Sequence, residues 1–247
     1  MSRHPPENTE DIRLGAPLPG WAPPPPPSRE ALEGRYVRLE PLATAHADAL
    51  HAAFAGDDAM WAYMPYGPFP DAAAYAAWVD RNTPGDDPLF FALRDLGTGR
   101  AGGVASYLRI TPAAGSIELG HIALSRALRG SRAATEAWFL MMDWAFGAGF
   151  RRFEWKCNAL NLPSRRAAQR LGLGYEGIFR QAAVVKGRNR DTTWFAAIDS
   201  EWPALRAAFL AWLDPANFDP AGQQRQALSR LTGPVLAARD PALDGGA

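Results

Sequence analysis

Residues 117–149 join a strand, a tight turn and a long helix, and their sequence is IELGHIALSRALRGSRAATEAWFLMMDWAFGAG. Ser116 to Leu124 is a largely apolar run that predicts a strand. Ala134 to Phe146 repeats apolar side chains at helical spacing and is followed by Gly147 and Gly149, which are common helix stops. The amides of a first helical turn have no partner within the helix, and the helix dipole adds partial positive charge there. The turn between the two elements is therefore a candidate site for an anionic group.

This turn combines a glycine with two arginines. Its residues are Arg129, Gly130, Ser131, Arg132, Ala133 and Ala134. Gly130 lets the backbone approach a ligand closely, and Arg129 and Arg132 carry forked donors that suit phosphate. The turn matches neither the Gly-x-x-x-x-Gly-Lys-Ser/Thr loop nor the Gly-x-Gly-x-x-Gly loop of nucleotide-binding folds. A solvated turn without a ligand is the alternative interpretation.

Alternating polar and apolar residues, together with turn residues, predict the other elements. Strands are expected at 35–42, 89–94, 101–109, 152–157, 179–185 and 192–199, and helices at 43–54, after an N-cap at Asp71, and at 164–171. This order indicates a mixed α/β (α+β) sheet with helices packed on it, within a domain that spans residues 35–202. It excludes a barrel of repeated βαβ units.

The two ends of the chain differ from this domain. Residues 1–34 are expected to form a proline-rich arm, because proline removes amide donors and favours extended geometry. The arm is either a recognition tract or a spacer held on the domain by Trp21. Residues 203–247 are expected to form a helical extension that frays from Asp240 onwards. Its short helices are expected at 205–213 and 223–231.

The composition excludes several classes of protein. The 247 residues include 26 Lys and Arg and 26 Asp and Glu, so no global positive charge holds nucleic acid, although a local basic patch stays open. One cysteine, Cys157, excludes internal disulfides, and the four histidines are too scattered to bind a metal. No apolar run is long enough to cross a membrane, and the first residues lack a secretory signal. We therefore expect a cytoplasmic protein with no metal, nucleic-acid or membrane partner.

Four motifs follow one another along the chain. They are Ile117-Glu118-Leu119-Gly120-His121-Ile122-Ala123-Leu124, the turn with Ala134-Thr135-Glu136-Ala137, Asn161-Leu162-Pro163-Ser164, and Leu171-Gly172-Leu173-Gly174-Tyr175-Glu176-Gly177. With these motifs the chain resembles the GNAT superfamily of acetyl-CoA-dependent N-acetyltransferases, in its branch similar to the ribosomal-protein-alanine N-acetyltransferases. The match covers about two-thirds of the chain, and four ordered motifs are more specific than any one of them.

The resemblance implies a mixed, mostly antiparallel sheet with helices on both faces and a splayed central strand pair. It also implies acetyl-CoA as co-substrate, with His121, Ile122, Ala123 and Leu124 beside its acetyl and pantetheine groups. An amide near Ile122 or Ala123 is then expected to bind the oxyanion that forms during transfer. The pyrophosphate is expected on the amides of residues 130–134.

One residue of the turn departs from the family pattern. Arg132 stands where the family loop usually has its second glycine. Its side chain either narrows the cradle or folds outward onto a phosphate, and we favour the second arrangement because guanidinium and phosphate form strong forked hydrogen bonds.

Acid–base roles also follow from the resemblance. Relatives commonly use an acidic residue of this strand, so Glu118 is the leading candidate for the general base, acting directly or through water. The alternative is a structural ion pair between Glu118 and a strand neighbour such as Arg109. His121 is a second candidate because histidine titrates near neutral pH, and its alternative is a plain position on the strand face.

Ser164 and Asn161 lie at the start of the next expected helix. By resemblance, the Ser164 hydroxyl lies beside the thioester sulfur and can protonate the departing thiolate, while Asn161 binds the pantetheine amides. Both residues also suit the capping of a helix or turn. Arg165, Arg166 and Arg170 form a basic helix face that either reaches the adenosine 3′-phosphate or is only solvated.

Aromatic residues gather at 61–78 and form either the wall of an acceptor pocket or a packed core. Tyr66 is the expected pocket member, because its loop is expected over the acetyl end. Cys157 either carries an acetyl-cysteine intermediate or is a small core residue, and the apolar strand around it favours the core. Ala182 and Ala183 stand where relatives that act on ribosomal-protein termini often carry an acid.

Together these residues predict an acetyl-CoA-dependent N-acetyltransferase that acts on a primary amine by direct attack on the thioester. The acceptor is either a protein or peptide N-terminus or a small-molecule amine, and the protein is a monomer or homodimer. The alternatives are a non-catalytic acyl-CoA-binding or regulatory module and a scaffold that works through its proline arm. The acceptor's identity does not follow from the sequence, because the acceptor loops vary within the superfamily.

Overall fold

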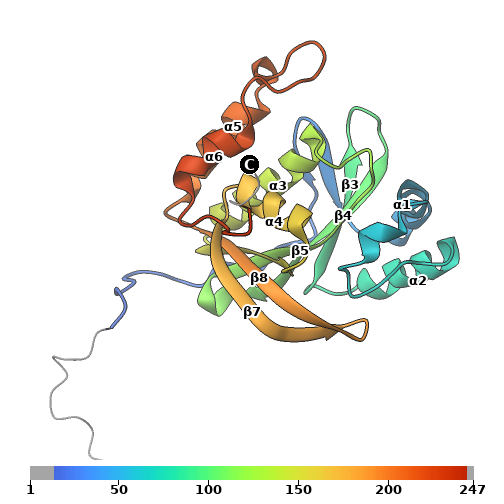
Figure 1. The fold of residues 1–247 in the computed structure, drawn as a ribbon, viewed down its shortest axis with the longest axis horizontal. Coiled ribbons are helices and arrows are strands. Elements are labelled where there is room, and N and C mark those ends of the chain that lie inside the picture. Colours follow the sequence, from blue (N-terminus) through green and yellow to red (C-terminus); the bar gives the residue numbers. More distant parts are fainter. Residues whose placement is uncertain (1–13, 244–247) are drawn as a thin grey trace, which may run out of the picture.

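One sheet organises the described part of the chain, residues 14–243 of the computed structural model (Figure 1). Its eight strands lie in the order β1-β2-β3-β4-β5-β6-β8-β7, and every pair is antiparallel except β5 with β6. The strands are β1 (Leu32–Glu33), β2 (Val37–Pro41), β3 (Leu89–Asp95), β4 (Ala101–Thr111), β5 (Ser116–Leu124), β6 (Arg152–Asn158), β7 (Gly174–Val185) and β8 (Arg188–Ile198). The helices are α1 (Ala47–Phe54), α2 (Ala72–Asn82), α3 (Arg132–Gly147), α4 (Leu162–Arg170), α5 (Trp202–Leu213) and α6 (Leu228–Thr232).

The parallel strands β5 and β6 pair over only part of their length. Their last paired residues are Leu119 and Trp155, whereas β5 continues to Leu124 and β6 to Asn158. Beyond the last pair the two strands separate and leave an opening in the middle of the sheet. The splayed central strand pair is confirmed.

β5 contains a bulge beside this opening. Val104 pairs with Ala123 and Ser106 pairs with Gly120, so two residues of β5 face one residue of β4. One of the two is His121, whose φ of 52° lies in the left-handed region that non-glycine residues seldom adopt. A bulge bends its strand and leaves one residue outside the regular hydrogen-bond ladder. The backbone of β5 is therefore irregular at the point where the strands part.

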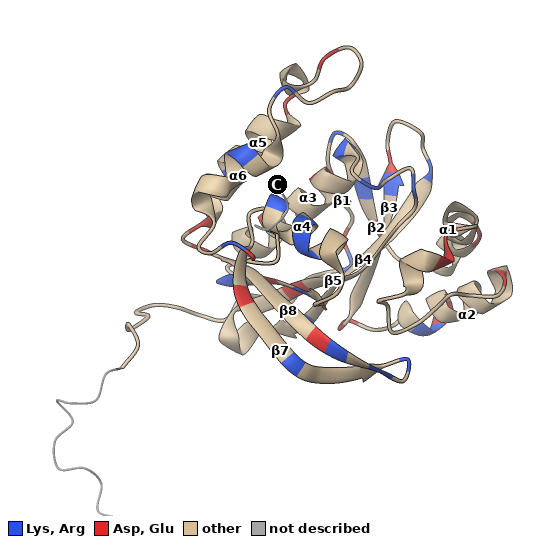
Figure 2. Ribbon diagram, viewed as in Figure 1, with Lys and Arg blue, Asp and Glu red and all other residues tan. Residues whose placement is uncertain are grey.

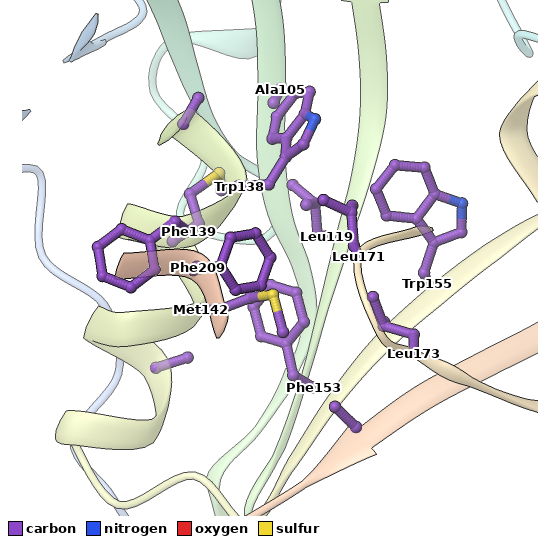
Figure 3. Packing of buried hydrophobic residues seen from close by; sticks show 14 of the residues in the cluster. Ala105, Leu119, Trp138, Phe139, Met142, Phe153, Trp155, Leu171, Leu173 and Phe209 are labelled. Atoms are coloured by element: carbon purple, nitrogen blue, oxygen red, sulfur yellow. The ribbon is translucent and has the colours of Figure 1, made fainter. Parts of the chain in front are cut away.

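Alternation along the strands builds a core on each face of the sheet. Leu89, Phe91 and Leu93 of β3 belong to the larger core, beneath α3 and α5, while Phe90 and Ala92 belong to the smaller core, beneath α1 and α2. Helices therefore cover both faces, and the predicted fold class is confirmed. Figure 3 shows part of the larger core, in which the labelled residues include Trp138, Phe139 and Met142 of α3, Leu119 of β5, and Phe153 and Trp155 of β6.

The β7–β8 hairpin is longer than the sequence predicted. β7 begins at Gly174 rather than at 179, and the turn to β8 consists of Lys186 and Gly187 alone. β7 is an edge strand with mostly exposed side chains, so its first residues lack the apolar alternation by which a strand is recognised.

The C-terminal extension packs onto the domain. α6 begins only at Leu228 rather than at 223, because Gln224 forms an isolated β-bridge with Phe218 and the chain bends at residues 225–226. Asp240 is fully buried against Arg165 of α4. The prediction that the chain frays from Asp240 is therefore wrong at Asp240 itself, while residues 244–247 lie outside the described residues.

Part of the proline-rich arm also lies against the domain, although residues 1–13 lie outside the described residues. The Arg151 guanidinium is 6.0 Å from the centre of the Trp21 ring. Arg29 forms an ion pair with Asp86 at 3.0 Å. These contacts hold the described portion of the arm on the surface. None of the helices between residues 14 and 243 has the length and apolarity that a bilayer crossing requires.

Candidate active site

Two cavities meet at the opening between β5 and β6. The smaller cavity, of about 460 Å³, is lined by residues 118–122 of β5 and by the β7–β8 hairpin. The larger cavity, of about 1170 Å³, is lined by the turn before α3, by α4 and by the C-terminal extension. The residues common to both walls are Tyr63, Ile122, Trp155, Asn161 and Ser164. A ligand that occupies both cavities therefore passes these five residues.

The turn before α3 offers free amides to the larger cavity. Within residues 14–243, no acceptor is bonded to the amides of Gly130, Arg132 or Ala133. The Ser131 amide donates to a backbone carbonyl and the Ala134 amide to the Ser131 side chain, so these two predicted donors already have partners. Gly130 has a φ of 71°, and no atom lies within 4 Å of the position that a Cβ would take. The free donors and the open space suit an anionic ligand, although the side chain of Ala133 lies in the larger core.

Three arginines in the wall of the larger cavity form no ion pair with a carboxylate of the described chain. They are Arg132 at the start of α3 and Arg166 and Arg170 on α4. Figure 2 shows basic residues on α4. Unpaired guanidinium groups beside free amides give this wall a positive charge that suits a ligand with several phosphates.

The Arg132 side chain stacks on aromatic residues. Its guanidinium carbon lies 4.4 Å from the centre of the Phe218 ring and 5.0 Å from that of Tyr36. Such contacts use the flat faces of the guanidinium and leave its N–H groups directed outward in the plane. Arg132 is thus held at the edge of the larger cavity, with its hydrogen-bond donors available to a ligand.

Two other arginines are already neutralised. Arg129 Nη2 lies 2.5 Å from Asp57 Oδ2, and its Nε donates to the Leu124 carbonyl. Arg165 donates to both carboxylate oxygens of Asp240, at 2.6 and 2.5 Å, and is buried. Arg129 lines the larger cavity as a paired cation, and the predicted basic face of α4 lacks Arg165.

Asn161 and Ser164 lie where the two cavities join. Asn161 caps α4, because its Oδ1 accepts from the Ser164 amide at 3.2 Å. Ser164 Oγ accepts from Trp155 Nε1 at 3.0 Å and does not cap the helix. The indole donor fixes the hydroxyl through one lone pair, which leaves the hydroxyl hydrogen to be donated elsewhere.

Glu118 belongs to a buried charge cluster in the wall of the smaller cavity. Its Oε2 accepts from Arg109 Nη1 at 2.7 Å and lies 3.0 Å from Lys156 Nζ. Lys156 Nζ in turn lies 2.7 Å from Glu154 Oε2. The ion pair with Arg109 is thus present, and Lys156 joins it. No donor among the described residues is bonded to Glu118 Oε1, so this oxygen is the one left to accept a proton.

Arg190 of β8 adds a further positive charge to the smaller cavity. It is half-buried, and its Nε donates to Thr192 Oγ1 at 3.3 Å. Burial and the charge of Arg109 lower its pKa, whereas Cys157 and the Glu118 carboxylate act in the opposite direction without reversing the shift. Between residues 14 and 243, no carboxylate forms an ion pair with Arg190.

His121 faces Tyr66. The two rings stack with centroids 5.5 Å apart, and His121 Nδ1 lies 3.1 Å from the Tyr66 hydroxyl oxygen. Burial first, and then the charges of Arg109 and Arg190, lower the pKa of His121 to about 4. The imidazole is therefore neutral near pH 7 and binds a proton only weakly, which weakens the case for His121 as the general base.

Tyr63, rather than Tyr66, lies in the cavity walls. Tyr66 packs against Trp78, with ring centroids 4.6 Å apart, and belongs to the smaller core. Burial raises the pKa of Tyr66. Tyr63 lines both cavities, and its hydroxyl donates to the Leu160 carbonyl at 3.2 Å. The tyrosine that lines the cavities is thus Tyr63, three positions before the expected Tyr66. Aromatic composition alone does not reveal which side chains of a loop face a cavity.

Cys157 is a buried residue of β6. Burial raises the pKa of its thiol to about 11, so the thiol is protonated near pH 7. This burial agrees with the interpretation of Cys157 as a small core residue. Among the residues that the structure describes, no group of three His, Cys, Asp or Glu side chains is placed to hold a metal ion.

The sequence analysis missed Lys156, Arg190 and the C-terminal aromatics as site residues. Alternation along β6 places Lys156 on the same face as Glu154, and the parallel pairing brings Glu118 to that face. Phe218 was not identified because it reaches the larger cavity from an extension that carries no recognised motif. Figure 2 shows charged residues along both strands of the β7–β8 hairpin, which forms one edge of the sheet.

Comparisons with known proteins define the class to which this architecture belongs. The family model for the acetyltransferase (GNAT) domain matches residues 37–174. The chain belongs to the GNAT acetyltransferase family, whose members use acetyl-CoA. It is an N-acetyltransferase of that family.

Solved structures agree with this assignment. The chain is 48% identical to a GCN5-related N-acetyltransferase from Brucella melitensis, over 87% of this chain and 100% of that chain, with a TM-score of 0.86. It is 42% identical to a probable GNAT-family acetyltransferase from Chromobacterium violaceum, over 78% and 98%, with a TM-score of 0.74. A ribosomal L7/L12 alpha-N-protein acetyltransferase shares the fold at 22% identity, over 68% and 94%, with a TM-score of 0.59. No curated protein matches the chain.

Proposed function

We propose that the protein transfers the acetyl group of acetyl-CoA directly to a primary amine held in the smaller cavity. The observation that carries this proposal is the meeting of the two cavities at the opening between β5 and β6. A thioester that lies across this opening is accessible to an amine from the other side. The buried, protonated thiol of Cys157 supports direct attack rather than an acetyl-cysteine intermediate.

The larger cavity fits acetyl-CoA by its donors. The free amides of Gly130, Arg132 and Ala133 suit the pyrophosphate. Arg166 and Arg170, together with the Arg132 side chain, supply charge for the remaining phosphate. Asn161 and Ser164 then flank the pantetheine arm where it enters the opening. The C-terminal extension forms part of the wall of this cavity through residues such as Phe218.

The residues at the opening supply what aminolysis of a thioester needs. The amine nitrogen forms a bond to the carbonyl carbon, and Glu118 Oε1 takes the proton from that nitrogen, directly or through water. The amide of Ile122 or Ala123, beside the bulge of β5, donates to the oxyanion. The carbon–sulfur bond then breaks, and the Ser164 hydroxyl donates a proton to the thiolate. Arg109 and Lys156 hold the Glu118 carboxylate in place.

Two measurements on the purified protein test this proposal. Calorimetry with coenzyme A is expected to show binding, and a thiol-release assay with acetyl-CoA is expected to identify at least one amine that is acetylated. The amines include short peptides with free N-termini and small molecules. Absence of heat with coenzyme A contradicts the proposal. Binding without thiol release for any amine supports a non-catalytic module instead.

A further inference from the structure

The smaller cavity has an excess of positive charge. Its wall contains the cations Arg109, Lys156 and Arg190 but the carboxylate of Glu118 alone, while His121 is the remaining titratable imidazole and is neutral near pH 7. An acceptor site that binds a polycation is expected to have a net negative charge, which is the opposite of what this cavity has. The hairpin wall also offers no acid at Ala182 and Ala183.

Two of these three cations are already neutralised by protein carboxylates. Arg109 and Lys156 share Glu118, and Lys156 also binds Glu154. Arg190 differs, because no carboxylate of the described residues pairs with it and Thr192 Oγ1 is its acceptor. A half-buried guanidinium without a counterion loses solvation and recovers little in return. Arg190 is therefore the cation left for a ligand.

Arg190 lies on the acceptor side of the opening. It lines the smaller cavity and not the larger one, so the phosphates of a ligand in the larger cavity are not its natural partners. Its charge acts on His121 and Cys157, both of which line the smaller cavity. A guanidinium here faces the same space as Glu118.

We infer that the acceptor is a small amine that also carries an anionic group, a carboxylate or a phosphate, and that Arg190 binds this group while the amine faces Glu118. This inference rests on the proposed function and names its substrate class. A guanidinium forms two parallel hydrogen bonds with either anion. The cavity of about 460 Å³ has the size of a small-molecule site.

The test compares amines that differ only in charge at the far end. γ-Aminobutyrate, n-butylamine and 1,4-diaminobutane form one matched set, and O-phosphoethanolamine with ethanolamine forms another, so that the two sets distinguish carboxylate from phosphate. The anionic amines are expected to have a kcat/KM about 10- to 100-fold above their neutral partners, since a hydrogen bond to a charged group contributes that much. An equal kcat/KM within a set, or preference for the diamine, overturns the inference.

Variants assign the preference to Arg190. Arg190→Gln is expected to remove the advantage of the anionic amine over its neutral partner, mainly through a higher KM for the anionic amine, and to leave the affinity for acetyl-CoA unchanged. Arg190→Lys is expected to retain part of it, because the charge stays but the fork is lost. Arg188→Gln removes an exposed arginine of the same strand that lies outside both cavities, and is expected to change nothing. An equal loss of kcat/KM for the charged and the neutral amine, which leaves their ratio unchanged, overturns the assignment. Failure of every amine to release thiol instead refutes the proposed function.

Discussion

Lys156 Nζ lies 3.0 Å from Glu118 Oε2, and both side chains are almost entirely buried, with 6% and 3% of their surface exposed. The contact joins β5 to β6 at the last point where they lie side by side. Lys156 thereby fixes one carboxylate oxygen and leaves the other free in the smaller cavity. This single ion pair links the stability of the splayed strands to the orientation of the proposed base.

Glu118→Gln is expected to lower kcat by about 100-fold or more, because a positioned general base contributes at least that much. It is also expected to flatten the rise of the rate with pH. Steady-state kinetics across a pH series measures both effects.

Glu154→Gln is the matched control. Glu154 binds the same Lys156 and also Arg152, but it does not line the cavity. The variant is expected to lose stability and to retain most of kcat. Equal losses of kcat in the two variants would show that the charge cluster as a whole, rather than Glu118 as a base, supports the rate.

Ser164→Ala and Asn161→Ala are expected to separate chemistry from binding at the start of α4. Ser164→Ala removes the proposed proton donor and is expected to lower kcat while the KM for acetyl-CoA stays constant. Asn161→Ala removes the helix cap, and is expected to raise that KM and to lower the free energy of unfolding by about 1 kcal/mol. A Ser164→Ala variant with unchanged kcat contradicts the role of the hydroxyl.

Arg132→Ala is expected to raise the KM for acetyl-CoA several-fold with little change in kcat, because Arg132 lines the larger cavity and not the smaller one that holds Glu118. Arg126→Ala provides the control, since Arg126 is an exposed cation that precedes the same turn but does not line the cavity. Initial rates over a range of acetyl-CoA concentrations distinguish the two variants. If both variants change the KM equally, a general loss of positive charge explains the effect.

Features set by local sequence were predictable. Asp71 caps α2 as expected, with its Oδ1 accepting from the Ala74 amide at 2.8 Å. The start of α3 is likewise set locally, since Ser131 Oγ accepts from the Ala134 amide, although the helix begins at Arg132 rather than at the expected Ala134. Side-chain alternation and capping depend on neighbours along the chain, so they are visible in the sequence.

Features that depend on register or on distant segments were not predictable. The pairing of Glu118 with Lys156 requires the register of two strands that α3 separates. The pair of Arg165 with Asp240 joins residues 75 positions apart. Phe218 enters the larger cavity from the extension. The sequence shows that a buried charged residue needs a partner of opposite charge, but only the fold determines which residue that partner is.

His121 is expected to make the protein less stable as the pH falls from about 6.5 to about 4. The pKa of His121 is about 4 in the folded protein and near 6.5 in the unfolded chain, so the unfolded chain binds more protons in the window between pH 4 and pH 6.5. Stability that depends on the neutral imidazole is present above the window and is lost as the pH falls through it, by about 3 kcal/mol at most.

The matched variant is His121→Asn, because asparagine tolerates the left-handed backbone and does not titrate. Chemical denaturation measures the free energy of unfolding of both proteins across the window. As the pH falls, the free energy of unfolding of the wild type is expected to decrease relative to that of the variant. A difference that stays constant with pH would show that His121 is protonated equally in both states.

Asp240→Asn is expected to lower the free energy of unfolding by about 3–5 kcal/mol, because it leaves the buried Arg165 guanidinium without its counterion. Asp143→Asn breaks the partly exposed pair with Arg206 and is expected to cost less than about 1 kcal/mol. Urea denaturation near neutral pH compares them. Replacing Arg165 and Asp240 together by Met and Leu is expected to cost less than Asp240→Asn alone, since no uncompensated charge remains buried. If Asp240→Asn costs no more than Asp143→Asn, solvent reaches Arg165 and the C-terminal extension is not held to α4 by this pair.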